Sequence, residues 1–551
     1  MKLSKHLKTL ALASASLVLV STLNHEDVNA QEDGSLVIGL SSDISSLDPH
    51  RSNDVYSSQV RSQIYERLIG HDLDMNLVPM LATEWEQVDD VTWNFKLEEG
   101  VMFHEGSELT SEDVQATFER VKDEAVAADV AFLFEMIDEV EIIDDYEFNI
   151  ITEYPFAPLL NHLSHVTGGI MSKELLDADY QYAIDNAGLD ITVEEYYELR
   201  EEGGDEYQEI VDEIGIDLNT VTNESPDGTG PLKFVSRAPG DNVVLERNED
   251  YRVEDLAFEE VTFTVNTESG SRMAELQTGT AHVLHALSPS SVTQVETTDG
   301  MELLSVDGLG LSYMTYDIRK EPFDDPKVRQ AIAYAVDRES IATHIYEDNA
   351  SPAISPLAPP VWGHNPDVDT IQYDPEYAAE LLSETDVADG FTTSLWVTDN
   401  QQVVEMATLI QENLAEIGIE VNIELMDFGT LWQRTGDGEH EMMIVGWTTS
   451  TADADYGTYS LLHTDNQGAA GNRTFISDPE LDDLLERGRG ESDEDLRYEI
   501  YTEAQNYLVE IAPMTNIIHA KSIIAYNSDF VTGVELFPSG YINLMNIEFV
   551  E

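Results

Sequence analysis

The sequence predicts an α/β protein with more than one lobe, and two observations carry this prediction. The chain has 551 residues, a length that suggests more than one lobe, and 42% of them are hydrophobic, which is enough for real cores. Its second half alternates segments of strand and helix periodicity. Because a strand–helix–strand order brings its two strands together in parallel, we expect parallel pairing there.

Residues 1–30 are typical of a secretory signal peptide. An apolar run at residues 10–23 precedes "VNA" at residues 28–30, which suits a cleavage site before Gln31. Three cations stand before the run: Lys2, Lys5 and Lys8. The run is too short to span a bilayer. We therefore expect cleavage and a soluble, secreted mature chain, periplasmic or associated with the cell surface; an uncleaved anchor is the alternative.

Two strands and a helix stand out in the first half. "SLVIGL" at residues 35–40 and the alternating "TWNFKL" at residues 92–97 predict strands. Thr110 and Asp113 have the spacing of a capping box. The helix that they begin has one apolar face, formed by Val114, Phe118 and Val121.

An acidic stretch at residues 177–224 has a helical pattern, and we expect it to be a surface insertion. The glycines of "DGTGPLKF" at residues 227–234 follow it. This motif lacks the Lys-Ser/Thr of a phosphate loop, so it predicts a turn into a strand.

Helices of the second half begin at Asp-Pro pairs, where aspartate can cap and proline suits the first helical position. These pairs are Asp325–Pro326, Asp374–Pro375 and Asp478–Pro479. A strand is expected at residues 311–318. Residues 401–417 have one apolar helical face that ends at Gly418, and the alternating residues 419–425 follow as a strand.

Aromatic and polar residues gather where the next strand ends. "EMMIVGW" predicts a buried strand, and "TTSTADAD" follows it directly. In open α/β sheets, ligands bind at the carboxyl ends of strands. Trp447 could cover a ligand there, while hydroxyls and carboxylates could bind a donor-rich one. The alternative is a structural loop with a core tryptophan.

The net charge is −82, because 109 acidic residues stand against 27 basic ones. The 6 Trp, 23 Tyr and 17 Phe argue against disorder, so we expect a folded protein with an acidic shell suited to a salty medium. The negative electrostatic potential of such a shell disfavours nucleic acid and anionic membranes as partners. Cysteine is absent, which excludes disulfides, thiolate metal sites and a lipidation cysteine. The 14 histidines form no tight cluster, and we expect no metal and no cofactor.

Six segments, spread over nearly all of the predicted mature chain, are collinear with those of a known class. They are "LATEWEQVDDVTWNFKLEEGVMFHEGSELTSEDVQATFERV", "GTGPLKFVSRAPGDNVVLERNEDY", "PFDDPKVRQAIAYAVDRESI", "YDPEYAAELL", "ISDPELDDLLERG" and "LRYEIYTEAQNYLVEIAPM". They resemble the peptide-binding class of extracytoplasmic solute-binding proteins of ABC importers.

Within that class the chain resembles glutathione-binding proteins, whose pattern is followed by "GFTTSLWVTDN", "MDFG", "GWTTSTADAD" and "NHLSH". The resemblance implies that dipeptide-binding relatives carry an aspartate, which receives the peptide ammonium, where this chain has Ser450. It also implies that they carry an arginine for the peptide carboxylate in the loop that here is "VTDN". Both departures argue against a plain dipeptide binder, while the acidic insertion departs from all of these relatives.

The resemblance implies two α/β lobes that face each other across a cleft and close on ligand about a hinge near Gly310 and Ala520. A discontinuous first lobe would comprise residues 31–309 and 521–551, and the second lobe residues 310–520. It also implies a non-catalytic receptor, expected to be a monomer. This receptor would capture glutathione or a similar short peptide and deliver it to ABC permease subunits. A general di- or oligopeptide-binding protein of the same class is the alternative.

Glutathione carries one ammonium, two carboxylates and a thiol, and these groups select the candidate ligand residues. Acceptors for the ammonium would be Asp54, Asp453 and Asp455. Forked donors for the carboxylates, unless they are surface ion pairs, would be Arg51, Arg434 and Arg473. Trp447 would be an apolar wall or a core residue. Neutral partners would be Asn53, Asn400, Asn472, Ser450 and Thr451.

A secreted hydrolase and a nickel-chelate binder are the minor alternatives. The sequence contains no G-x-S-x-G and no H-E-x-x-H motif, and no second histidine completes the near match His104-Glu105. Turnover of a chromogenic peptide would identify a hydrolase, and calorimetry with nickel chelates would identify the binder.

Overall fold

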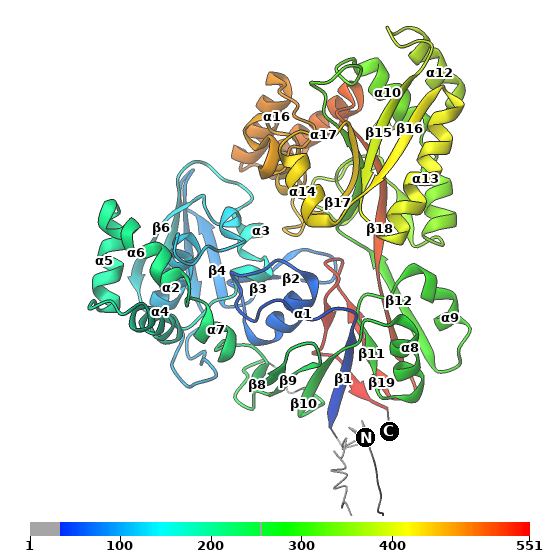
Figure 1. Cartoon of the computed structure of the whole chain (residues 1–551). Helices are drawn as coiled ribbons and strands as arrows, with labels where there is room; N and C mark the ends of the chain where they lie inside the picture. Colours follow the sequence, from blue (N-terminus) through cyan, green and yellow to red (C-terminus); the bar gives the residue numbers. More distant parts are fainter. Residues whose placement is uncertain (1–33, 254–255, 551) are drawn as a thin grey trace, which may run out of the picture.

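The computed structural model describes residues 34–253 and 256–550, so the predicted signal peptide lies outside the described residues. Two α/β lobes are stacked, and both ends of the described chain lie in the same lobe (Figure 1). We call residues 34–309 and 521–550 the first lobe and residues 310–520 the second lobe. Within the described ranges, every helix is too short or too polar to cross a bilayer.

One sheet of twelve strands runs through both lobes. Its order is β16 (Ile419–Leu425), β15 (Phe391–Val397), β17 (Met442–Thr448), β13 (Gly310–Tyr316), β18 (Met514–Asn527), β11 (Val283–Leu284), β1 (Ser35–Leu40), β10 (Glu260–Val265), β9 (Asn242–Arg247) and β8 (Leu232–Ala238), with β12 (Met301–Asp307) and β14 (Ala350–Pro352) also paired to β18. β15 pairs with β16 and β17 in parallel, which confirms the α/β prediction.

Strand β18 joins the two lobes. Residues 514–520 of β18 pair with β13 and β14 of the second lobe, and residues 521–527 pair with β12 and β11 of the first. Asp307, the last residue of β12, lies opposite Lys521, and β13 begins at Gly310. The chain thus changes lobes in two neighbouring strands, where the hinge is predicted.

The helices of the second lobe begin where the Asp-Pro pairs predict. Each capping aspartate accepts a hydrogen bond from a backbone N–H of its own first turn, in α10 (Pro326–Ala335), α12 (Pro375–Ser383) and α16 (Pro479–Gly490). Helix α13 (Gln401–Glu416) buries Met406, Ile410 and Leu414 completely against the sheet core. Each such side chain stabilises the fold by roughly 1.5–3 kcal/mol through removal from water. The remaining long helices of this lobe are α14 (Phe428–Gly436), α15 (Ala454–Leu462) and α17 (Glu494–Ile511).

The first lobe contains a second, antiparallel sheet with its own core. Its strand order is β4 (Ala82–Gln87), β5 (Thr92–Leu97), β7 (Glu147–Thr152) and β6 (Ile137–Asp144). Helix α2 (Ser111–Lys122) begins at the predicted capping box, where the Asp113 carboxylate accepts from the Thr110 backbone N–H at 2.8 Å. The C-terminal residues after β18 pack into the same core as β1.

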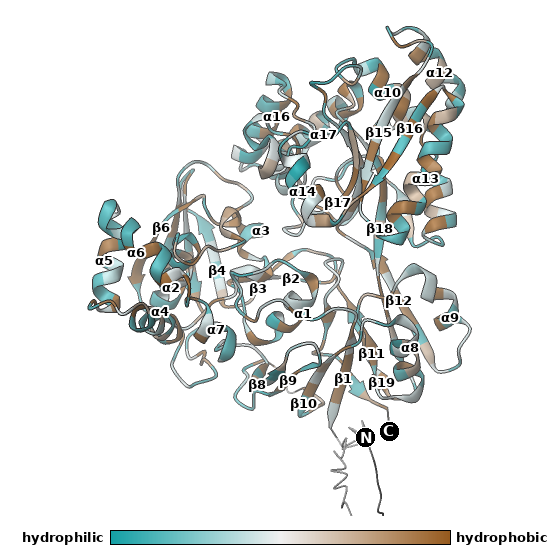
Figure 2. Cartoon of the chain, viewed as in Figure 1, coloured by the Kyte–Doolittle hydropathy of each residue, from teal (hydrophilic) through white to brown (hydrophobic). Residues whose placement is uncertain are grey.

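The acidic stretch is helical and has a small core of its own. It forms α4 (Lys173–Ala187), α5 (Val193–Glu202), α6 (Asp205–Gly215) and α7 (Thr220–Glu224). Helices α5 and α6 are hydrophilic over most of their length, whereas the strands of the large sheet are largely hydrophobic (Figure 2). The buried Asp123 carboxylate anchors the stretch, because it accepts hydrogen bonds from the hydroxyls of Tyr180, Tyr196 and Tyr207 at 2.7–3.0 Å.

Candidate functional site

The acidic pair after β17 is buried in ion pairs within the second lobe. Asp453 caps α15 and accepts two hydrogen bonds from Arg497, at 2.8 and 2.6 Å. Asp455 accepts two from Arg489, both at 2.9 Å. Each aspartate is only 1% exposed. Burial raises the pKa of the Asp455 carboxyl, but the attraction of Arg489 outweighs it, so the pKa is lowered.

Asp453 and Asp455 therefore already have their charge partners. A ligand ammonium would have to displace an arginine from a desolvated, doubly bonded pair, which is costly. Both carboxylates hold α15 against α16 and α17.

Trp447 lies at the junction of the two lobes. Its half-buried ring packs against apolar clusters of both lobes and lies 5.1 Å from the ring of Tyr456. The indole N–H is buried and has no hydrogen-bond partner among the described residues. Next to it, the Thr451 carbonyl accepts from Asn161 of the first lobe at 3.3 Å. The "GWTTST" loop is thus part of the contact between the lobes.

The three predicted arginines have partners inside their own lobes. Arg51 donates to the Val126 and Ala127 carbonyls. Arg434 pairs with Glu439 at 2.8 Å, on the half-exposed surface. Arg473 is buried, stacks 3.4 Å above the ring of Trp432 and donates to nearby carbonyls.

The remaining polar candidates serve local structure. Asp54 caps α1 (Val55–Ile64), and Asn400 caps α13. Asn472 is buried and donates to three backbone carbonyls, while Asn53 is exposed. The structure does not bring these side chains together with the arginines at one site, so ligand binding by them stays a prediction.

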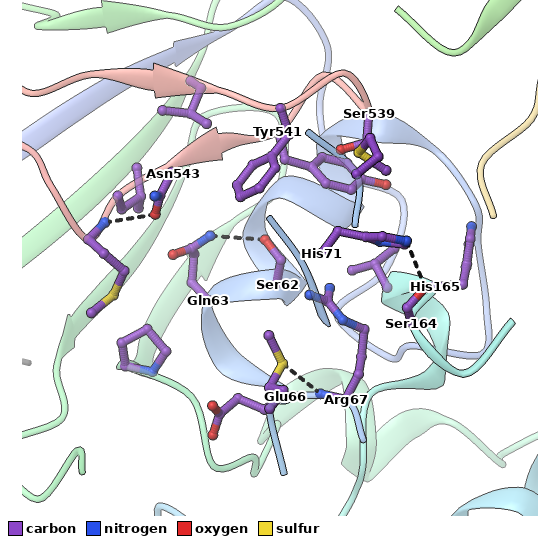
Figure 3. Close-up of a pocket in the computed structure, with 18 of the residues that line it drawn as sticks. Ser62, Gln63, Glu66, Arg67, His71, Ser164, His165, Ser539, Tyr541 and Asn543 are labelled. Atoms are coloured by element: carbon purple, nitrogen blue, oxygen red, sulfur yellow. Dashed lines mark hydrogen bonds between the residues drawn. The ribbon is translucent and has the colours of Figure 1, made fainter. Parts of the chain in front are cut away.

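A cavity of about 170 Å³ lies where the first lobe meets the "GWTTST" loop. Ser450 is the predicted ligand residue that lines it, and it comes from the second lobe. The other walls come from the end of α1, the hairpin of β2 (Ile69–His71) and β3 (Leu77–Pro79), the residues after α3 (Leu159–Leu163), and the C-terminal segment 537–545 (Figure 3).

Glycine allows the close packing that positions this cavity. A Cβ on Gly228 would lie 2.2 Å from the Ile64 carbonyl oxygen, and one on Gly230 would lie 2.4 Å from that of Gln63. The "DGTG" turn, which leads into β8 as predicted, therefore lies directly against the end of α1. This contact fixes the first residues after α1, which project into the cavity.

The tip of the β2–β3 hairpin reaches the second lobe. Met75 has a left-handed backbone conformation (φ 63°), lines the cavity and also packs against an apolar cluster of the second lobe. The Asp72 carboxylate shapes this turn by accepting from the backbone N–H groups of Asp74 and Asn76, both at 2.9 Å. The thioethers of Met80 and Met545 extend the apolar part of the lining.

The two cavity histidines are neutral at physiological pH. Burial lowers the pKa of His71 to about 4 and that of His165 to about 3. The cavity carboxylate, Glu66, is already occupied: it accepts from Arg252 at 2.6 and 3.0 Å, from Thr229 and from Tyr251. The remaining charged group of the lining is Arg67.

Sequence reasoning missed most of this lining, including Arg67 and Tyr541. "NHLSH" gave one signal, because Ser164 and His165 of that motif line the cavity. The sequence signal for Arg67 is the scarcity of basic residues, because only 27 stand against 109 acidic residues and each is therefore a candidate anion ligand.

Comparison with known proteins gives the family. The sequence model of the bacterial extracellular solute-binding proteins, family 5, matches residues 76–469. A glutathione-binding protein of Pectobacterium atrosepticum is 28% identical over 94% of each chain. A dipeptide-binding protein of Escherichia coli is 27% identical over 88% of each chain.

Solved structures have the same two-lobed fold. A periplasmic binding protein of Helicobacter pylori in complex with the peptide STSA superposes with a TM-score of 0.74, at 26% identity, over 94% of this chain and 98% of that one. HbpA2 of Haemophilus parasuis superposes with a TM-score of 0.79, at 24% identity, over 94% of this chain and 100% of that one. This chain belongs to the bacterial extracellular solute-binding proteins of family 5, the substrate-binding components of ABC importers.

Proposed function

We propose that the chain captures glutathione or a similar short peptide outside the cytoplasmic membrane. It then delivers the ligand, chemically unchanged, to the permease subunits of its importer. Cleavage before Gln31 would release the mature form, which we expect to act as a monomer. Family membership supports the role of receptor, and the glutathione-binding and dipeptide-binding relatives support a peptide ligand.

The observation that carries the choice of ligand is Ser450. This neutral hydroxyl lines the cavity from the second lobe. At this position, the resemblance to dipeptide-binding proteins implies an aspartate in those relatives. A hydroxyl cannot neutralise a peptide ammonium as a carboxylate does. A plain dipeptide therefore lacks its charge partner here, which favours glutathione over the general peptide alternative.

A thermal-shift screen of the mature chain tests this function. The panel would contain reduced and oxidised glutathione, di- to pentapeptides and a nickel–histidine chelate. A ligand at 100 times its dissociation constant stabilises by about 2.7 kcal/mol. We expect glutathione to raise the melting temperature more than any simple dipeptide at equal concentration.

Other outcomes of the screen identify the alternatives. Submicromolar binding of a dipeptide without glutathione binding would restore a general peptide-binding protein. A response to the nickel chelate alone would indicate a chelate receptor. Hydrolysis of glutathione or of a chromogenic peptide would contradict a receptor that leaves its ligand unchanged.

A further inference from the structure

Arg67 differs from all other arginines that the structure describes. In residues 34–253 and 256–550, every other arginine donates at least one side-chain hydrogen bond, whereas Arg67 donates none and forms no ion pair. Its Nε atom is buried without a partner. Among 109 acidic residues, an arginine without a carboxylate is not explained by a shortage of partners.

The side chain of Arg67 points into the cavity (Figure 3). The adjacent carboxylate, Glu66, is turned to Arg252, which binds both of its oxygens, at 2.6 and 3.0 Å. His71 and His165 bring no negative charge, and the hydroxyl of Tyr541 is protonated because burial raises its pKa. Arg67 thus faces cavity walls whose acidic groups are neutral or already paired.

Arg67 is also held in place through its backbone. Its N–H lies 3.3 Å from the Met80 sulfur, and its carbonyl accepts from the Leu81 N–H at 3.1 Å. Gly230 donates to the Ile64 carbonyl at 2.8 Å, three residues before Arg67. The backbone of Arg67 is therefore fixed at the cavity wall, and the guanidinium extends into the cavity from a defined position.

We infer that Arg67 binds a carboxylate of the ligand and that the ligand class is short peptides with a surplus carboxylate. This inference rests on the proposed function and names a residue that serves it. A guanidinium offers five N–H donors in a planar fork that matches a carboxylate. Glutathione, with two carboxylates and one ammonium, supplies one carboxylate for Arg67 and retains a second. An unpaired guanidinium in a cavity of an acidic protein is compensated when such an anion enters.

The test is a double-mutant cycle between Arg67 and the ligand carboxylates. The variants are R67M, which removes the charge at similar length, and R67K, which keeps the charge without the fork. R487M is the matched control, because Arg487 forms an exposed pair with Asp483 at 3.3 Å. The ligands are reduced glutathione and its two monoamides, each of which lacks one carboxylate. If a panel dipeptide binds more tightly, the class of peptides with a surplus carboxylate is overturned, and that dipeptide and its C-terminal amide then test the role of Arg67 alone.

For R67M we expect affinity for the free acid to fall about 10- to 100-fold, since charge-assisted hydrogen bonds are lost. In the wild type, the affinity for one of the two amides should be lower than that for glutathione by a similar factor. In R67M, this amide and glutathione should bind with equal affinity. R67K should be intermediate and R487M unchanged. The melting temperature of unliganded R67M should stay equal or rise, because the substitution removes a partly buried charge without a partner; a structural arginine would lower it.

Failure of the inference and failure of the proposed function differ in this experiment. Two results would overturn the role of Arg67 alone. R67M could bind the free acid as tightly as the wild type does, or amidation could lower the affinity by the same factor in the wild type and in R67M. Absence of binding by the wild type to every peptide of the panel would overturn the proposed function and this inference with it. A large drop in the melting temperature of R67M would assign Arg67 to the fold and overturn the inference.

Discussion

The ion pair of Asp453 and Arg497 joins the start of α15 to α17. Both side chains are buried, and two short hydrogen bonds connect them. Removing one partner leaves the other as an uncompensated charge in a medium of low polarity, which costs more than the pair contributes.

Asp453→Asn should therefore destabilise the fold by about 3–5 kcal/mol. Urea unfolding measures this loss. Asp483→Asn is the control, because its pair with Arg487 is exposed and such pairs contribute roughly 0–1 kcal/mol. If Asp453→Asn keeps full stability but loses peptide binding, the carboxylate belongs to the ligand site after all.

Sequence reasoning located the loop after β17 but not the partners of its side chains. Arg489 and Arg497 lie 34 and 44 residues beyond Asp455 and Asp453, and no periodic pattern connects residues at that distance. Ser450 was found because the resemblance marks it as a departure. Arg67 could not be found in this way, because a missing partner is visible only in three dimensions.

At the scale of elements, local rules were sufficient for much of the fold. The capping box of α2, the three Asp-Pro starts and the alternating strand β16 each depend on neighbouring residues, and each is confirmed. The acidic stretch shows the limit of such rules. Its helices follow from their pattern, but their attachment depends on Asp123. This residue lies more than fifty positions before Tyr180, the first of the tyrosines that bind it.

Asp123→Ala should release α4, α5 and α6 from the first lobe. It leaves three buried tyrosine hydroxyls without an acceptor, and we expect a loss of about 3–5 kcal/mol. Hydrogen exchange should show lost protection in these helices, while peptide binding persists. The control is Glu124→Ala, whose exposed carboxylate binds Gln208. Protection that is lost evenly over both lobes would contradict a local anchor.

At the scale of the whole molecule, buried imidazoles make the fold sensitive to acid. Burial lowers the folded-state pKa to about 3 for His50 and His165, and to about 4 for His71, His104, His282, His285, His440 and His519. In the unfolded chain the pKa is about 6.5. Between these values the unfolded state binds more protons, so the stability falls as the pH falls.

As the pH falls from 6.5 to about 4, each of these imidazoles should lower the free energy of unfolding by up to about 1.4 kcal/mol per pH unit. We expect the melting temperature to drop steeply from pH 7 to pH 5, measured in 1 M sodium chloride to screen the carboxylates. His519→Gln should flatten this slope, and His344→Gln, which changes an exposed ring, should not. A melting temperature that is constant over this range would contradict the burial of neutral histidines.

The charge of −82 should make stability depend on salt. Surface carboxylates repel one another over about 8 Å at 0.15 M salt but only about 3 Å at 1 M. The melting temperature should rise with sodium chloride from 0.05 to 3 M, steeply at first and then levelling off. Peptide affinity should change far less, because contacts inside a closed cavity are less screened. A flat curve would mean that the repulsion is neutralised locally, and a rise in sulfate alone would indicate general salting-out.

We propose that the cavity between Arg67 and Ser450 holds the ligand. A crystal structure of the mature chain with reduced glutathione tests it most directly. We expect the peptide inside this cavity, in contact with Ser450 of the second lobe, with one carboxylate at roughly 2.7–3.2 Å from the Arg67 guanidinium. A peptide bound elsewhere, with its ammonium on Asp453 or its carboxylate on Arg473, would contradict ligand binding in this cavity.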